Sequence, residues 1–144
     1  MRIYMFAAAI ALSPGLALAC STGETEVFSC TTASGKSVQV CQAPESIRYT
    51  FGRAGAATKM TVSVPNSVFV WHSDGGSAMH TIDLNFDTRG TRYVVSATRY
   101  RDEQPPLDAQ IQVEQSGKQV ASLVCRDDSV RLAERAITAA KTPY

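Results

Sequence analysis

The sequence predicts a mainly β protein: an antiparallel β sandwich or small barrel of about eight short strands, with a C-terminal α-helix. Short runs in which apolar and polar residues alternate predict the strands, because successive side chains of a strand point to opposite faces. Glycine, proline and asparagine recur between these runs, as tight turns require. The chain has 144 residues, of which 44% are hydrophobic and 19% charged. This composition suits one globular domain with a core of its own.

Residues 1–19 form a predicted secretory signal peptide. Arg2 supplies the positive charge, the run Ile3–Leu12 is uncharged and mostly apolar, and Ala17–Ala19 has the small residues of a cleavage site. The apolar run is too short to span a bilayer, which takes about 20 apolar residues. We therefore expect export to the periplasm, with an uncleaved N-terminal anchor as the alternative.

Cleavage after Ala19 leaves a chain without net charge. It removes Arg2, one of the 14 basic residues, so that 13 basic and 13 acidic side chains remain. This balance gives no electrostatic reason to expect binding to nucleic acid or to a membrane. We expect residues 20–126 to form the β domain and residues 127–141 to form a helix packed on it.

The first two predicted strands, Glu24–Thr32 and Ser37–Gln42, enclose a turn sequence. Glycine at the first position of a two-residue loop is typical of a type II′ turn, so Gly35-Lys36 is the predicted loop. Counting outward from that loop places Cys30 opposite Cys41, with both side chains on the same face.

All four cysteines follow the cleavage site, and an even number in an exported chain predicts disulfides. The hairpin pairs Cys30 with Cys41, and elimination pairs Cys20 with Cys125. Cys20 comes directly after the cleavage site, so the alternative is an outer-membrane lipoprotein lipidated at Cys20. We expect the soluble periplasmic form, because lipidation would leave one thiol unpaired in an oxidising compartment.

Further runs rich in β-branched and aromatic residues predict the rest of the β domain. Turn sequences such as Pro65-Asn66 and Ser116-Gly117-Lys118 separate them. The predicted strands are Ile47–Phe51, Lys59–Val64, Ser67–Trp71, Thr81–Phe86, Thr91–Thr98, Gln110–Glu114 and Gln119–Cys125.

The spacing of the apolar residues changes from a strand pattern to a helical pattern after Asp128. Val130, Ala133, Ile137 and Ala140 recur at helical intervals, with charged residues elsewhere on the helical wheel. The acidic and hydroxyl residues at 127–129 are N-cap candidates. This pattern predicts a helix that packs on the β domain, or else one that serves a partner.

We expect no catalytic residues and no cofactor. The sequence contains no nucleophile elbow, no phosphate-binding loop and no zinc-protease helix motif. Because every cysteine is predicted to be bridged, no thiol nucleophile remains. The chain is therefore predicted not to be an enzyme.

The segment Trp71–His80 is the predicted partner-binding loop. It contains the only tryptophan, followed by small residues, and binding loops typically sit on rigid scaffolds of this kind. The alternative is a core tryptophan followed by a long hairpin connection. The predicted contact residues are Trp71, His72, Ser73, Asp74, Ser77 and His80.

The same loop contains both histidines, which allows two further hypotheses. His72 and His80, with Asp74, would form a zinc or copper site if the two ends of the loop converged. Ser77, His80 and Asp74 would form a hydrolase triad, but no elbow or oxyanion-hole signature accompanies them.

Four arginines, three of them next to tyrosines, form a second candidate surface. Alternation along a strand places Arg99 and Arg101 on one face and Arg92 with Tyr100 on the other. This pattern favours a solvated strand edge, with a patch for an acidic partner as the alternative. The cluster comprises Arg89, Arg92, Arg99 and Arg101, with Tyr93 and Tyr100 between them.

Three motifs resemble a largely uncharacterised family of small exported bacterial β proteins. They are Val27-Phe28-Ser29-Cys30, then Gly35-Lys36-x-Val38-x-Val40-Cys41, then Ile47-x-Tyr49-x-Phe51-Gly52. The resemblance extends to the hairpin that ends at Cys125, and it implies a fold rather than an activity.

A shorter pattern, Phe28-x-Cys30 followed by Gly35-Lys36, is similar to that of bacterial lysozyme inhibitors of the periplasm and outer membrane. This resemblance implies a non-catalytic inhibitor that inserts a loop into the cleft of a peptidoglycan-cleaving enzyme. Here the loop would be Trp71–His80, with Ser77 and His80 binding the carboxylates of the enzyme. The alternative is an envelope-associated structural or immunity protein that binds another secreted protein.

Overall fold

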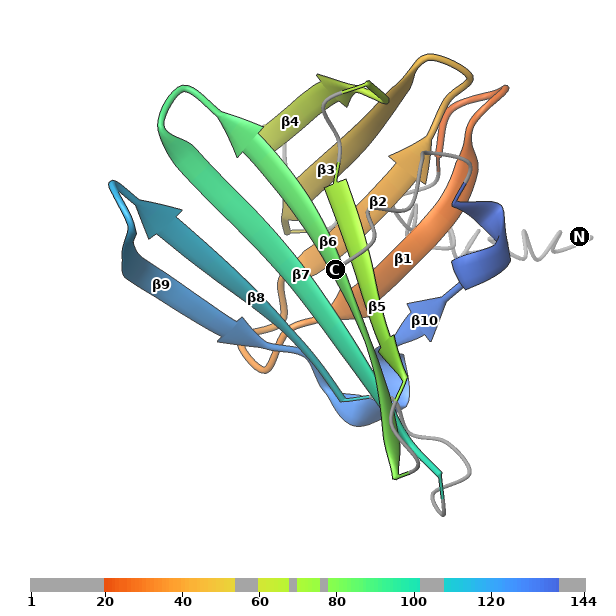
Figure 1. Cartoon of the computed structure of the whole chain (residues 1–144), viewed down its shortest axis with the longest axis vertical. Helices are drawn as coiled ribbons and strands as arrows, with labels where there is room; N and C mark the ends of the chain where they lie inside the picture. The colour runs from red at the N-terminus through yellow and green to blue at the C-terminus, as the bar shows by residue number, and fades with distance from the viewer. Residues whose placement is uncertain (1–19, 54–59, 68–69, 76–77, 102–107, 138–144) are drawn as a thin grey trace, which may run out of the picture.

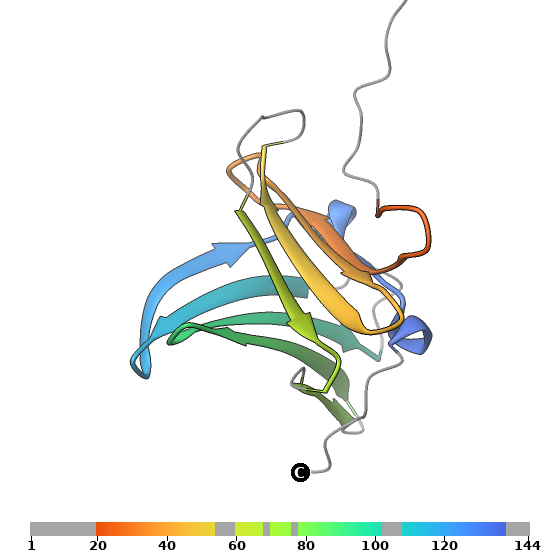
Figure 2. The same ribbon diagram turned by 90° about the horizontal axis from the view of Figure 1, so that it is seen from above.

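The computed structural model describes residues 20–53, 60–67, 70–75, 78–101 and 108–137, so the predicted signal peptide lies outside the described residues. The predicted mainly β fold is confirmed: two five-stranded antiparallel sheets form separate layers (Figures 1 and 2). Sheet I has the strand order β10-β1-β2-β3-β4, and sheet II has the order β5-β6-β7-β8-β9. The strands are β1 (Thr25–Thr31), β2 (Ser37–Gln42), β3 (Ser46–Gly52), β4 (Met60–Pro65), β5 (Val70–Gly75), β6 (Met79–Thr88), β7 (Thr91–Tyr100), β8 (Asp108–Gln115), β9 (Lys118–Val124) and β10 (Arg131–Leu132).

The core lies between the two sheets and follows the predicted alternation. On β6, Ile82, Leu84 and Phe86 are buried, whereas the residues between them are only partly buried. Tyr49 of sheet I lies against Phe86 and Tyr93 of sheet II, with ring centroids 5.7 and 5.5 Å apart. These aromatic contacts join the two layers at the centre of the core.

The first hairpin differs from the predicted register. Its loop is longer than two residues, since the Thr32 amide donates to the Lys36 carbonyl and Thr31 pairs with Ser37. Cys30 therefore lies opposite Val38, and a register shift between Glu26 and Phe28 places Cys41 opposite Glu26. Val38 and Cys41 are three residues apart on β2, so the longer loop by itself places Cys30 and Cys41 on opposite faces, whatever the bulge in β1 adds.

The disulfides consequently differ from the predicted pairs. Cys20 is bonded to Cys41, and Cys30 is bonded to Cys125. Cys30 and Cys125 belong to the core cluster, whereas Cys41 is buried outside that cluster, on the outer face of sheet I. The predicted Cys30–Cys41 and Cys20–Cys125 pairs are wrong because the true register places Cys30 and Cys41 on opposite faces. The expectation that all four sulfurs are bridged is confirmed.

The predicted C-terminal α-helix is also wrong. Residues 127–137 form two single 3₁₀ turns, η1 (Asp127–Ser129) and η2 (Glu134–Ala136), on either side of β10. β10 pairs with β1, and the Ala133 amide donates to the Val27 carbonyl at 2.8 Å. The exposed edge of β1 offers backbone partners to an extended chain, which a short isolated helix could not use. Ile137 is buried in the core, and Ala140 lies outside the described residues.

The described residues include no helix that is long and apolar enough to cross a membrane. The two disulfides agree with an oxidising, extracytoplasmic location.

Candidate functional site

Most of the predicted Trp71–His80 loop is strand. β5 runs to Gly75 and β6 starts at Met79, so His72 pairs with Asp83 and Ser73 pairs with Ile82. The prediction of a long loop is wrong because these residues complete an antiparallel ladder instead. Trp71 pairs with Leu84 along this ladder. Ser77 and the side chains of Trp71, His72 and Asp74 lie outside the described residues.

His80 contacts a serine and a carboxylate of its own chain. Its Nε2 atom lies 3.4 Å from the Ser73 hydroxyl and 3.4 Å from Oε2 of Glu134 in η2. Both contacts use the same ring nitrogen, whereas a hydrolase triad needs one nitrogen for the serine and the other for the acid. This geometry ties the C-terminal segment to the β5–β6 hairpin.

The described residues contain one group of side chains close enough together to hold a metal ion, and it does not include His80. The group consists of Cys20, Glu24 and Cys41, whose two sulfur atoms are bonded to each other. A disulfide has no thiolate to offer a metal. The His72 side chain lies outside the described residues, so the described residues supply no ligand beside His80 for the hypothetical His72–His80 metal site.

The start of β6 and the end of β7 project beyond the other strands (Figure 1). Met79 and Tyr100 face each other across β6 and β7 there, with 51% and 37% of their surfaces exposed. Arg99 and Arg101 are exposed beside them, and the Arg101 amide donates to the Ala78 carbonyl. We call these five residues, Ala78, Met79, Arg99, Tyr100 and Arg101, the tip.

The tip contains half of the predicted arginine cluster. Arg89 lies in the turn at the opposite end of β6 and β7, and Arg92 binds Asp87 there at 2.9 Å. Met79 was not a sequence candidate, because only the β6–β7 register places it beside Tyr100. An exposed methionine next to a tyrosine is a feature that a sequence pattern does not reveal.

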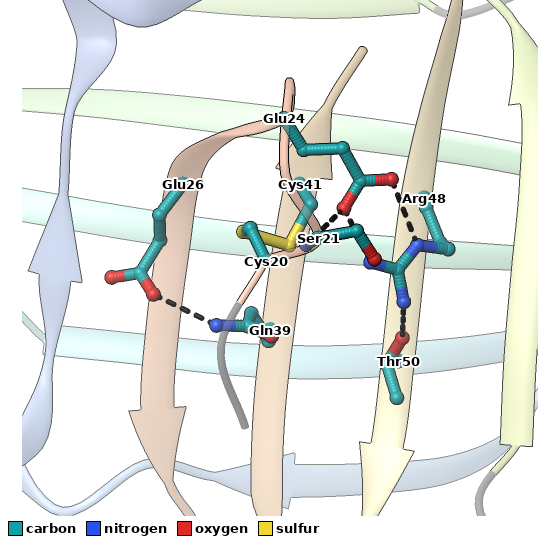
Figure 3. Close-up of polar contacts among 8 residues, drawn as sticks. All are labelled: Cys20, Ser21, Glu24, Glu26, Gln39, Cys41, Arg48 and Thr50. Carbon is teal, nitrogen blue, oxygen red and sulfur yellow. Dashed lines mark hydrogen bonds and ion pairs between the residues drawn. A yellow bond between two sulfur atoms is a disulfide. The ribbon is translucent and has the colours of Figure 1, made fainter. Parts of the chain in front are cut away.

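The segment that precedes β1 lies on the outer face of sheet I (Figure 3). The Cys20–Cys41 bond fixes one point of this segment, and Glu24 fixes another. The Glu24 carboxylate accepts from Nε of Arg48 at 3.2 Å, from Nη2 of Arg48, and from the Ser21 amide at 2.9 Å. The same sulfur of Cys20 cannot also carry a lipid thioether, so the bridge and the lipoprotein alternative exclude each other.

The stability of the fold is expected to depend on pH through the Glu24 carboxyl. The hydrogen bonds from Arg48 lower the pKa of the Glu24 carboxyl below its ordinary value of 4.5. Such a group stabilises the fold above the unfolded pKa, and the contribution disappears as the pH falls through the folded pKa. Both side chains are mostly shielded, with 15% and 26% of their surfaces exposed.

We expect Glu24→Gln to lower the free energy of unfolding by about 1 kcal/mol at pH 7. The difference from the unmodified protein should shrink below pH 4.5, as seen in urea denaturation at several pH values. Asp87→Asn is the control, since both partners of the Asp87–Arg92 pair are more than half exposed. A Glu24→Gln effect that is independent of pH would contradict this role of the carboxylate.

Comparison with known proteins finds no matching family model, no matching curated protein and no matching solved structure. The family resemblances of the sequence remain predictions, and the function is therefore inferred from the geometry of this chain.

Proposed function

We propose that this chain is a non-catalytic binding protein of the periplasm that inserts its tip into a carboxylate-lined cleft of another secreted protein. The target best suited to this chemistry is a lysozyme or another peptidoglycan-cleaving enzyme. The observation that carries the proposal is the exposed Met79–Tyr100 pair at a projecting strand end, where the exposed residues Arg99 and Arg101 are the sequence neighbours of Tyr100.

The apolar part of the tip suits a protein interface. Methionine and tyrosine are enriched at the centres of interfaces, where they supply large contact areas. Met79 and Tyr100 lie on paired strands, and the Arg101–Ala78 backbone hydrogen bond extends the pairing past the strand ends. A tip held in this way loses little conformational entropy on binding, which favours affinity.

The cationic part of the tip suggests the kind of cleft. Most glycoside hydrolases carry a pair of carboxylates at the scissile bond. Guanidinium groups bind carboxylates through two parallel hydrogen bonds, and Arg99 is exposed on the same strand as Tyr100. In this proposal Arg99, rather than Ser77 and His80, binds the carboxylates of the enzyme, because His80 already contacts Glu134.

The test is inhibition of enzymes by the oxidised mature protein. We expect it to slow at least one of the c-, g- and i-type lysozymes or the lytic enzymes of the host. Met79→Ser combined with Tyr100→Ser should weaken that inhibition about 30-fold, as loss of an interface hot spot does. Val120→Ser is the matched control, because Val120 is 55% exposed and lies on β9, away from the tip.

Two results would overturn the proposal. One is that none of these enzymes is slowed by the protein at micromolar concentration. The other is that the Met79→Ser/Tyr100→Ser variant inhibits as strongly as the Val120→Ser control.

A further inference from the structure

The outer face of sheet II contains a depression of about 390 Å³ between β7, β8 and the chain that follows β9. Its polar lining comes from Ser96, Thr98, Tyr100, Asp108, Gln110 and Asp127. On β7 the residues that alternate with these, Val95 and Ala97, are buried in the core. The depression is thus formed by the outward-facing side chains of the sheet.

We propose that this depression binds a neutral saccharide. Sugar hydroxyls both donate and accept hydrogen bonds, and the lining offers both kinds of partner. The carboxylates of Asp108 and Asp127 accept, and the amide of Gln110 donates and accepts. The volume lies within the range of small-molecule sites, about 300–1,000 Å³.

Two hydroxyls of the lining are held in place by β6. The Ser96 hydroxyl donates to the Asp83 carboxylate at 2.5 Å, so its oxygen remains available as an acceptor. The Thr98 and Thr81 hydroxyls lie 2.9 Å apart. Because these contacts fix the hydroxyls before a ligand arrives, less ordering is needed on binding.

Tyr100 supplies the aromatic surface that pyranose rings favour. It lines the depression with 37% of its surface exposed. An aromatic ring packs against the C–H groups of a sugar, while its hydroxyl reaches water or a polar partner. An aromatic ring, two carboxylates and one amide form a set suited to a polyhydroxylated ring.

Other ligand classes fit less well. No lysine or arginine is among the described residues that line the depression, and its two carboxylates repel anions. Asp108 and Asp127 do not belong to the group of described side chains that lie close enough together to share a metal ion. The charges of the lining disfavour anions and the spacing of its carboxylates disfavours a shared metal ion, so a neutral, hydroxyl-rich ligand fits best. This inference does not depend on the proposed function.

The experiment is a titration of the ¹⁵N-labelled, oxidised mature protein followed by amide chemical shifts. The probes are chitotetraose with all its N-acetyl groups, cellotetraose and maltotetraose, with glucosamine as a cationic probe. We expect at least one tetrasaccharide to shift the amides of Ser96, Thr98 and Gln110 in a saturable way. Asp108→Asn with Gln110→Ala should weaken this binding at least about tenfold.

The chain offers a matched control for each substitution. Gln112→Ala, two residues along β8, is the control for Gln110→Ala, and Asp128→Asn is the control for Asp108→Asn, because neither Gln112 nor Asp128 lines the depression. Gln112→Ala with Asp128→Asn should bind the tetrasaccharide as the unmodified protein does.

Three results would overturn the saccharide proposal: no amide shifts with any tetrasaccharide at its solubility limit, shifts confined to other faces, or shifts with glucosamine alone. Tyr100 belongs to both the tip and the depression, so this test relies on Asp108 and Gln110. The Asp108→Asn/Gln110→Ala variant should still inhibit the enzyme that the tip binds. Failure of the saccharide proposal is therefore distinguishable from failure of the proposed function.

Discussion

Replacing Cys30 and Cys125 together with alanine is expected to lower the free energy of unfolding by about 4–5 kcal/mol. The two cysteines are 95 residues apart in sequence, so their bond restricts most of the unfolded chain. In the folded protein the bond joins β1 of sheet I to the end of β9 of sheet II, next to the Thr32–Cys125 bridge. Denaturation in guanidinium chloride, with the other bridge oxidised, measures this loss.

Cys20→Ala with Cys41→Ala is the matched control. This pair closes a segment of only 21 residues, for which the chain-entropy relation gives about 3 kcal/mol. We therefore expect the Cys30/Cys125 variant to be the less stable of the two. The opposite order would mean that the bond between the sheets is not the more stabilising of the two bridges.

Replacing Tyr49 with alanine is expected to lower the free energy of unfolding by about 3–5 kcal/mol. Tyr49 is 1% exposed, and its ring contacts two aromatic rings of the other sheet, so truncation leaves a cavity at the centre of the core. The same burial raises the pKa of its hydroxyl above the ordinary value. Thermal and chemical denaturation measure the loss.

Two controls separate packing from other effects. Tyr49→Phe keeps the ring and should change stability by less than about 1 kcal/mol. Tyr100→Ala removes an exposed tyrosine and should change stability by less than about 0.5 kcal/mol. If Tyr49→Ala cost no more than Tyr49→Phe, the contact between the sheets would not depend on this ring.

The strands were predictable because they follow local patterns. The alternation of Ile82, Leu84 and Phe86 predicts β6 and its buried face, although the observed strand is longer at both ends. The turn at Ser116-Gly117 was predictable for a similar reason, since both residues adopt positive φ angles that suit a tight hairpin. Patterns of this kind depend on neighbours in the sequence alone.

Register and long-range pairing were not predictable from such patterns. The longer loop of the first hairpin places Cys30 opposite Val38, three residues from Cys41 on β2, so these two cysteines lie on opposite faces, and the Gly35-Lys36 turn sequence does not signal this. The residues around Val130 and Ile137 have helical spacing, yet the open edge of β1 holds this segment in an extended form. Among the candidate residues, Met79 becomes significant only through its pairing with Tyr100 on another strand.

Disulfide mapping of the natively purified protein is the decisive measurement, since the rigid scaffold depends on which sulfurs are joined. Digestion after glutamate and after basic residues cuts at Glu24 and at Lys36, which separates Cys20, Cys30 and Cys41 into different peptides. We predict one linked pair containing Cys20 and Cys41, and another containing Cys30 and Cys125. A peptide that links Cys30 to Cys41, or a free thiol at any of the four positions, would contradict the structure and the binding function built on it.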